Sequence, residues 1–191
     1  MEQVAAAPTA DARRRTSIIV TSAIAIAVVA VAIIFAANTP WYFVFKMIHV
    51  GAAVVWVGGG LFLAICAVLA ELARNDDQLL QVGYWAEHVA GRLFPLMSFV
   101  VLGFGIAMTA NGDIAYDQFW LVFGVIAWAL SAATGILFLG PEAKRLNKAA
   151  AEHGIKSPEV QARLQRILLV VRVDVALMFV IVLDMVAKPF S

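Results

Sequence analysis

Five long apolar runs constrain this 191-residue chain more than any other feature of its sequence. They cover residues 18–37, 43–70, 93–110, 119–140 and 167–187. A helix of about 20 mostly apolar residues is long enough to cross the hydrocarbon core of a bilayer. The runs are continuous rather than alternating, which excludes the strands of a membrane barrel. The sequence therefore predicts an all-α membrane protein with five transmembrane helices.

The composition agrees with this class. Hydrophobic residues make up 63% of the chain and charged residues 14%, whereas soluble domains are about half apolar and a quarter charged. These values exclude a soluble fold, and they also exclude disorder, which requires low hydrophobicity. The net charge of +1 provides no field that would attract nucleic acid. We therefore expect the lipid bilayer as the main partner, and other membrane protein subunits in one alternative below.

Lysine and arginine residues are present in every second connecting segment and absent from the segments between them. The tail 1–17 has three arginines, the segment 71–92 has two basic residues and 141–166 has six, whereas 38–41 and 111–118 have none. Basic loops stay on the cytoplasmic side of a membrane. We therefore expect a bacterial-type inner membrane protein with a cytoplasmic basic tail, a cytoplasmic N-terminus and an extracytoplasmic C-terminus.

We expect residues 18–191 to form a single transmembrane domain. The run 18–37 is longer than the apolar part of a signal peptide, and no charged residue marks a buried face. It is predicted to be a retained, peripheral first helix beside a four-helix core. The segment 141–166 is predicted to be a cytoplasmic helical loop in which Gly154 stops one helix. Ser157 and Pro158 then begin the last helix as its cap and first residue.

His49 is the main candidate for chemistry because it lies about 9 Å below the start of its helix. Trp56 follows His49 by seven residues on the same face, and Lys46 precedes His49 by one turn. The run Gly58-Gly59-Gly60 lets a backbone or a flat ligand approach closely. The alternatives are a hydrogen bond from the imidazole to a neighbouring carbonyl, glycines that serve packing, and a Lys46 that extends to the interface.

Charged residues inside the runs predict two polar layers. The outer layer contains Lys46, His49, Asp184 and Lys188. The inner layer contains Arg172, Asp174, His88 and Arg92. Lys188 is expected to pair with Asp184 at i,i+4, and Arg172 with Glu71 or Glu87. His49 and His88 should lie about 20 Å apart along the membrane normal, too far to ligate one haem together. Interhelical salt bridges without further function are the alternative for both layers.

The pattern His49, six residues, Trp56, one residue, Gly58-Gly59 resembles a signature of small membrane proteins related to copper-resistance protein CopD and the HemJ-type protoporphyrinogen oxidase. The ending Asp184 to Pro189 is similar to the close of a predicted integral-membrane family of unknown function. The resemblance implies a four-helix core with haem b, His49 as its metal ligand, and Lys46, Trp56 and Gly59 beside the cofactor.

Three functions follow from these residues. The first is a redox or haem-related role at His49, and the second is that of a non-catalytic accessory or assembly subunit of a larger membrane complex. The third is a small transporter or proton path between the polar layers, for which Ser98, Ser131 and Thr134 are the polar residues in the middle. Nucleotide-binding, zinc-protease and nucleophile-elbow motifs are absent, so no catalytic residue is assigned.

Overall fold

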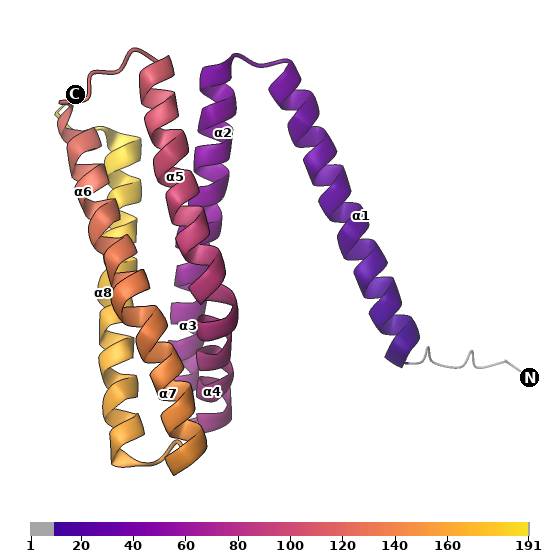
Figure 1. The fold of residues 1–191 in the computed structure, drawn as a ribbon, viewed down its shortest axis with the longest axis vertical. Helices are drawn as coiled ribbons and strands as arrows, with labels where there is room; N and C mark the ends of the chain where they lie inside the picture. The colour runs from indigo at the N-terminus through magenta and orange to yellow at the C-terminus, as the bar shows by residue number, and fades with distance from the viewer. Residues whose placement is uncertain (1–9, 191) are drawn as a thin grey trace, which may run out of the picture. The chain divides into compact units, whose positions relative to one another are not determined.

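The computed structural model describes residues 10–190. Within this range the ordered elements are helices, and no strand occurs (Figure 1). The predicted all-α class is confirmed. The chain divides into two units, Met1–Val44 and Phe45–Ser191, which are described separately. Residues 1–9 of the predicted basic tail lie outside the described range.

The first unit contains α1 (Ala10–Ala37). From Ile18 onward this helix consists mostly of alanine, isoleucine and valine, and none of its residues is buried. The side chains of Asn38 and Thr39 close its last turn by donating to the carbonyls of Ile34 and Phe35, at 2.8 and 2.5 Å. These bonds satisfy carbonyl groups that have no partner within the helix.

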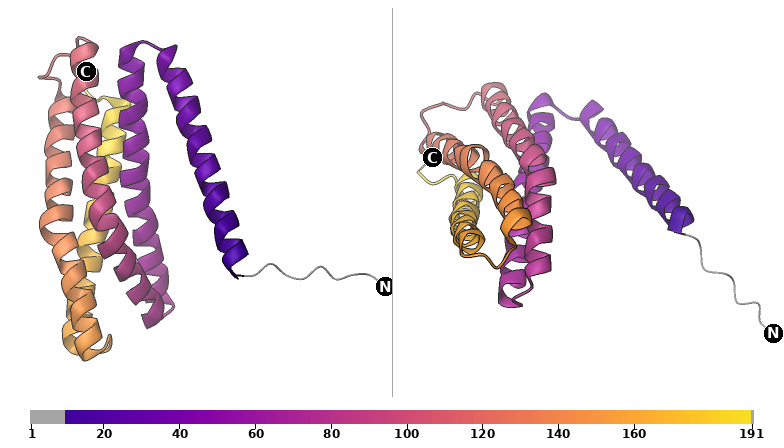
Figure 2. Two further views of the ribbon diagram at one scale, coloured as in Figure 1. Left: turned by 45° about the vertical axis from the view of Figure 1, so that its right-hand side comes forward. Right: turned by 60° about the horizontal axis from the view of Figure 1, so that its bottom comes forward.

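In residues 45–190 the chain forms four helical rods that pack as a bundle (Figures 1 and 2). The first rod is α2 (Trp41–Ala53), the π-helical turn η1 (Val54–Gly58) and α3 (Gly59–Leu72). The second is α4 (Asp76–Trp85), η2 (Ala86–Ala90) and α5 (Gly91–Asn111). The third is α6 (Phe119–Ala133), η3 (Thr134–Leu139) and α7 (Gly140–His153), and the fourth is α8 (Pro158–Ala187). The most extensive packing joins α8 to α6, followed by the contacts of α8 with α7 and of α3 with α4.

The lengths of these helices fit a membrane protein. Among residues 10–190, four helices are long and apolar enough to cross a membrane: α1 with 28 residues and the first three rods with 32, 36 and 35. The fifth long helix, α8, has 30 residues, but Arg172, Asp174 and Asp184 interrupt its apolar stretch. Because α8 packs along the other rods, its charged residues have protein beside them rather than lipid alone.

The two ends of the bundle differ in charge. The α3–α4 and α7–α8 turns lie together at one end (Figure 1), where Lys156 is 3.9 Å from Asp76. We call this the basic end because most lysines and arginines of the connections are there. The α5–α6 loop, with Asp113 and Asp117, and the end of α8 lie at the opposite, acidic end.

Local signals in the sequence set the boundaries of α7 and α8. Gly154 ends α7 with a φ of 77°, a conformation that other residues rarely adopt. The Ser157 hydroxyl accepts a hydrogen bond from the Val160 amide at 3.3 Å, and Pro158 is the first residue of α8. The predicted stop at Gly154 and start at Ser157 are confirmed. The predicted cytoplasmic helix before Gly154 continues directly from the preceding span through η3, because no residue there ends the helix.

A hydrophobic cluster holds the basic end together. It contains Ala67, Ala70, Leu79, Leu146, Ala149, Ala150, Val160, Leu164 and Leu168. Its members come from α3, α4, α7 and α8, and Val160 has no exposed surface. The cluster therefore binds the two connecting segments to the spans, and the segment 141–166 is a packed part of the fold.

We expect the stability of the basic end to fall at low pH because of Glu142. This carboxylate is buried and accepts hydrogen bonds from Arg145 and Arg163 at 2.6 and 3.1 Å. The Arg145 bond, followed by Arg163, holds the pKa of Glu142 below its ordinary value of 4.5, although burial opposes the shift. A lowered folded-state pKa stabilises the fold above the unfolded pKa, and this contribution disappears as the pH falls through the lowered value.

Thermal unfolding in detergent, followed from neutral pH to below 4.5, measures this contribution. Glu142→Gln should reduce the loss of Tm on acidification. The matched control is Glu152→Gln, because Glu152 is half-exposed and lies 3.9 Å from Lys148. An equal acid sensitivity in the Glu142→Gln variant and the wild type would contradict the prediction.

Candidate functional site

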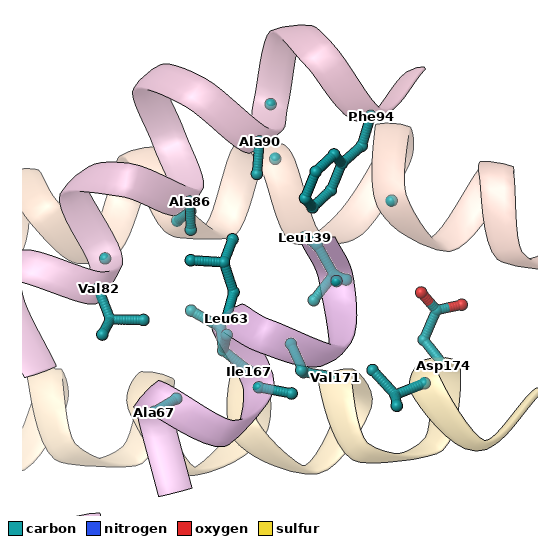
Figure 3. Close-up of a pocket in the computed structure, with 18 of the residues that line it drawn as sticks. Leu63, Ala67, Val82, Ala86, Ala90, Phe94, Leu139, Ile167, Val171 and Asp174 are labelled. Atoms are coloured by element: carbon teal, nitrogen blue, oxygen red, sulfur yellow. The ribbon is translucent and has the colours of Figure 1, made fainter. Parts of the chain in front are cut away.

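A cavity lies inside the bundle and extends from its middle toward the basic end (Figure 3). Its volume is about 160 Å³. All four rods contribute to its walls, largely with small residues such as Gly60, Ala64, Ala90 and Gly135. Small side chains on facing helices leave this space open, whereas leucine or phenylalanine at the same positions would fill it.

The π turns η1, η2 and η3 all border this cavity. Trp56 belongs to η1, Ala86 to η2 and Leu139 to η3, and each of these residues lines the wall. In a π turn the amide bonds to the carbonyl five residues earlier, as Gly91 does to Ala86 and Gly140 to Gly135. Such turns add one residue to a helix and are frequent at functional sites. Their meeting at one cavity marks it as the candidate site.

Gly59 allows close packing at the wall of the cavity. A Cβ atom at this position would lie 2.7 Å from Cε1 of Phe94, so only glycine leaves room for that ring. Figure 3 shows Phe94 reaching into the site from α5. This contact is the packing role considered for Gly59, and its place beside a cofactor stays a prediction. Trp56, seven residues after His49, is buried with 5% of its surface exposed.

Asp174 is the one charged residue among those described as lining the cavity. It projects from α8 into the space between the helices (Figure 3), and only 6% of its surface is exposed. Its Oδ1 atom has no hydrogen-bond partner within the described chain. The Ser131 hydroxyl lies beside it and is also without a hydrogen-bond partner of good geometry in residues 10–190. A buried carboxylate in this state favours a ligand that carries a donor or a positive charge.

His49 lies outside the two described cavities, against α5. Its Nδ1 is 2.7 Å from the carbonyl oxygen of Val101. Since a carbonyl can only accept, Nδ1 donates, and Nε2 carries no proton in the neutral ring. Gly105 makes room for the imidazole, because a Cβ atom there would lie 3.1 Å from its Cε1. The carbonyl bond considered from the sequence is therefore present, and Gly105 is a neighbour of His49 that sequence reasoning missed.

The predicted outer layer does not form one cluster. Lys46 is exposed. The predicted pairing of Lys188 with Asp184 is wrong, because α8 ends at Ala187 and Lys188 turns away with a φ of 45°. The Lys188 ammonium lies 4.8 Å from the centre of the Trp120 ring. Asp184 is buried against α6, where its Oδ2 would lie 3.6 Å from a Cβ atom on Gly124.

The residues of the predicted inner layer do not form one cluster either. Arg172 forms an ion pair with Glu71, one of its two predicted partners. His88 is exposed, stacks on Tyr84 with ring centroids 4.2 Å apart, and bonds through Nδ1 to the Tyr84 carbonyl. Arg92 is exposed as well. No group of three or more metal-binding side chains occurs within the described part of the chain. Asp174 alone of this layer lines the cavity.

Comparison with known proteins shows that the four-rod bundle matches one protein family. A family model described as "Predicted integral membrane protein (DUF2269)" matches residues 43–189, which span all four rods from the first turn of α2. No curated protein and no solved structure matches the chain. A relation to CopD or HemJ stays a prediction.

Proposed function

Because the chain belongs to the DUF2269 family of predicted integral membrane proteins, we propose that it binds a small, mostly apolar ligand inside the bundle, with Asp174 as the polar anchor. The observation that carries this proposal is the meeting of η1, η2 and η3 at one cavity with a buried carboxylate whose Oδ1 has no hydrogen-bond partner among residues 10–190. Ionisable residues inside a membrane are costly, so their default interpretation is functional. Pockets with one or two polar groups in an apolar wall are typical of ligand sites.

The volume of the cavity limits the size of this ligand. An engineered cavity of about 150 Å³ in another protein accommodates benzene. The cavity here, at about 160 Å³, therefore suits one ring or a short branched chain. The carboxylate of Asp174 and the hydroxyl of Ser131 favour an amine or another donor on that ligand. A haem macrocycle is much larger than this space and does not fit it.

Benzylamine and toluene provide a direct test in the purified protein, because they share a ring and differ in the ammonium group. Calorimetry should show tighter binding of benzylamine, by roughly tenfold or more, which corresponds to one charge-assisted hydrogen bond. Asp174→Asn should remove this difference, whereas Asp113→Asn, in the exposed α5–α6 loop, should keep it. Equal binding of the two compounds by the wild type would reject the anchor role of Asp174.

A second variant tests the location without changing any charge. Ala86 of η2 lines the cavity, and leucine at this position would occupy part of the space (Figure 3). We expect Ala86→Leu to abolish binding of both compounds. Ala133→Leu, at an exposed position of α6 that does not line the cavity, is the control. Unchanged binding by Ala86→Leu would place the ligand elsewhere.

A b-type haem at His49 is a second candidate, and one observation favours it. A metal-binding histidine commonly donates its other ring nitrogen to a carbonyl, as Nδ1 of His49 does to Val101. Nε2 of His49 would then hold the haem iron, and a bound haem would supply redox chemistry. Because His49 lines neither described cavity, haem would need space outside both.

The absorption spectrum of the purified protein tests the haem proposal independently of the cavity. A haem at His49 predicts a Soret band that His49→Ala removes and His153→Ala retains, since His153 is exposed at the basic end. A colourless wild-type protein, purified from cells supplied with haem, would end this proposal while leaving the ligand cavity untouched.

We further propose that the basic end faces the cytoplasm of a bacterial-type inner membrane. The six basic residues of 141–166 and the lack of any in 111–118 support this orientation through the positive-inside rule. An alkaline phosphatase fused after the C-terminus should be active, because this enzyme folds only in an oxidising compartment. An inactive fusion that is nevertheless expressed in the membrane would reverse the orientation.

A further inference from the structure

A second hollow opens at the acidic end of the bundle, between α6 and α8. Its lining includes Phe119, Phe123, Val180, Leu183 and Asp184, and its volume is about 290 Å³. It shares no lining residue with the cavity at Asp174. We call this hollow the outer groove. It is therefore a separate place for a ligand on the molecule.

Asp184 is the charged group of the outer groove. Only 6% of its surface is exposed, and its Oδ2 atom has no hydrogen-bond partner among residues 10–190. The nearest lysine in sequence does not neutralise it, because the ammonium of Lys188 lies over Trp120 instead. A buried carboxylate without a partner costs free energy, which a bound cation would recover.

The other walls of the groove are apolar and partly open. Phe119 and Phe123 stack with their ring centroids 6.0 Å apart. Val180 is 45% exposed and Leu183 is 65% exposed, on the part of α8 that leads from the groove toward the middle of the bundle. In a membrane such side chains face acyl chains. The groove therefore combines an apolar track with a negative charge near the end of a span, where lipid headgroups lie.

We propose that the outer groove binds a phospholipid with an ethanolamine headgroup, whose primary ammonium donates to Asp184. A carboxylate in an apolar wall selects a cationic donor, and the exposed Val180 and Leu183 favour a ligand with an acyl chain over a free amine. This inference does not depend on the cavity at Asp174.

Native mass spectrometry of the full chain, titrated with palmitoyl-oleoyl phosphatidylethanolamine or phosphatidylglycerol, tests the proposal. The two lipids share their chains and phosphate and differ in the ammonium group. We expect the ethanolamine lipid to bind about tenfold more tightly, as one charge-assisted hydrogen bond predicts. Asp184→Asn should remove this preference and Asp184→Glu should retain part of it. Asp117→Asn, in the exposed loop nearby, should leave it unchanged.

Three results would overturn the proposal. Equal binding of both lipids by the wild type would show that Asp184 does not select the headgroup, and this result does not depend on any variant folding. Competition by free ethanolamine at the same concentration as the lipid would show that the ammonium alone is recognised. Loss of the preference in Asp117→Asn as well would attribute it to general surface charge.

Discussion

A chain carrying Asp174→Leu is expected to unfold at a higher temperature than the wild type and to lose its ligand. Leucine is close to aspartate in size and removes a carboxylate whose Oδ1 has no partner within residues 10–190. Leaving one buried polar group unsatisfied costs about 1–3 kcal/mol, so the free energy of unfolding should rise by roughly this amount. Such an exchange of stability for function is common at binding sites.

Thermal unfolding in detergent, combined with benzylamine calorimetry, measures both effects in one preparation. Asp117→Leu is the control, because Asp117 is exposed in the α5–α6 loop and its replacement should change stability by less than about 0.5 kcal/mol. A destabilised Asp174→Leu variant would show that the carboxylate supports the fold rather than a ligand. Retained benzylamine binding would equally contradict its role as an anchor.

Leu146→Ala is expected to lose about 2–5 kcal/mol of stability, the usual range for emptying a packed core. Leu146 of α7 is 7% exposed and belongs to the hydrophobic cluster at the basic end. At this end the cluster extends beyond the apolar spans, where burial removes side chains from water. Between spans the hydrophobic effect contributes little, because lipid is as apolar as leucine. The basic end should therefore carry much of the measurable stability.

Leu72→Ala is the matched control, because Leu72 ends α3 at the same level and is 75% exposed. Its unfolding free energy should stay within about 0.5 kcal/mol of the wild type. Equal losses for the two variants, measured by denaturant titration in detergent, would mean that the basic end does not act as a separate core.

The sequence predicts the helices well because their signals are local. Apolar runs long enough to span a bilayer leave the backbone one simple solution, which is a helix that satisfies its own polar groups. Gly154, Ser157 and Pro158 mark a stop and a start by φ angle, cap and fixed ring, and the structure follows them. The Arg172–Glu71 pair was also predictable, because opposite charges at equal depth in a membrane seek each other.

The Asp184–Lys188 pair was predicted from a spacing that holds only inside a helix. The helix ends one residue too early, at Ala187, since Pro189 cannot continue it and Lys188 adopts a left-handed conformation. The hypothesis of a proton path between the two polar layers is also not favoured along α8. Its buried residue between Asp174 and Asp184 is the apolar Met178, which separates the two polar layers.

The cavity could not be read from the sequence. Whether a helix contains a π turn depends on its packing, and helical periodicity alone does not reveal one extra residue. Two prolines were nevertheless a signal. Pro95 and Pro141 come shortly after η2 and η3, and a proline ring displaces the carbonyl four residues before it. In the second rod, η2 ends beside Gly91, four residues before Pro95.

The π turns also fix the angular phase of the first three rods. One inserted residue rotates everything beyond it by about 100° around the helix axis. In the first rod, α2 therefore directs His49 to α5, whereas α3 directs Glu71 to α8. Deleting Val57 from η1 would return this rod to one phase and swing Glu71 away from Arg172. The first rod therefore consists of two helices with different angular phases, and one span can contact two neighbouring rods.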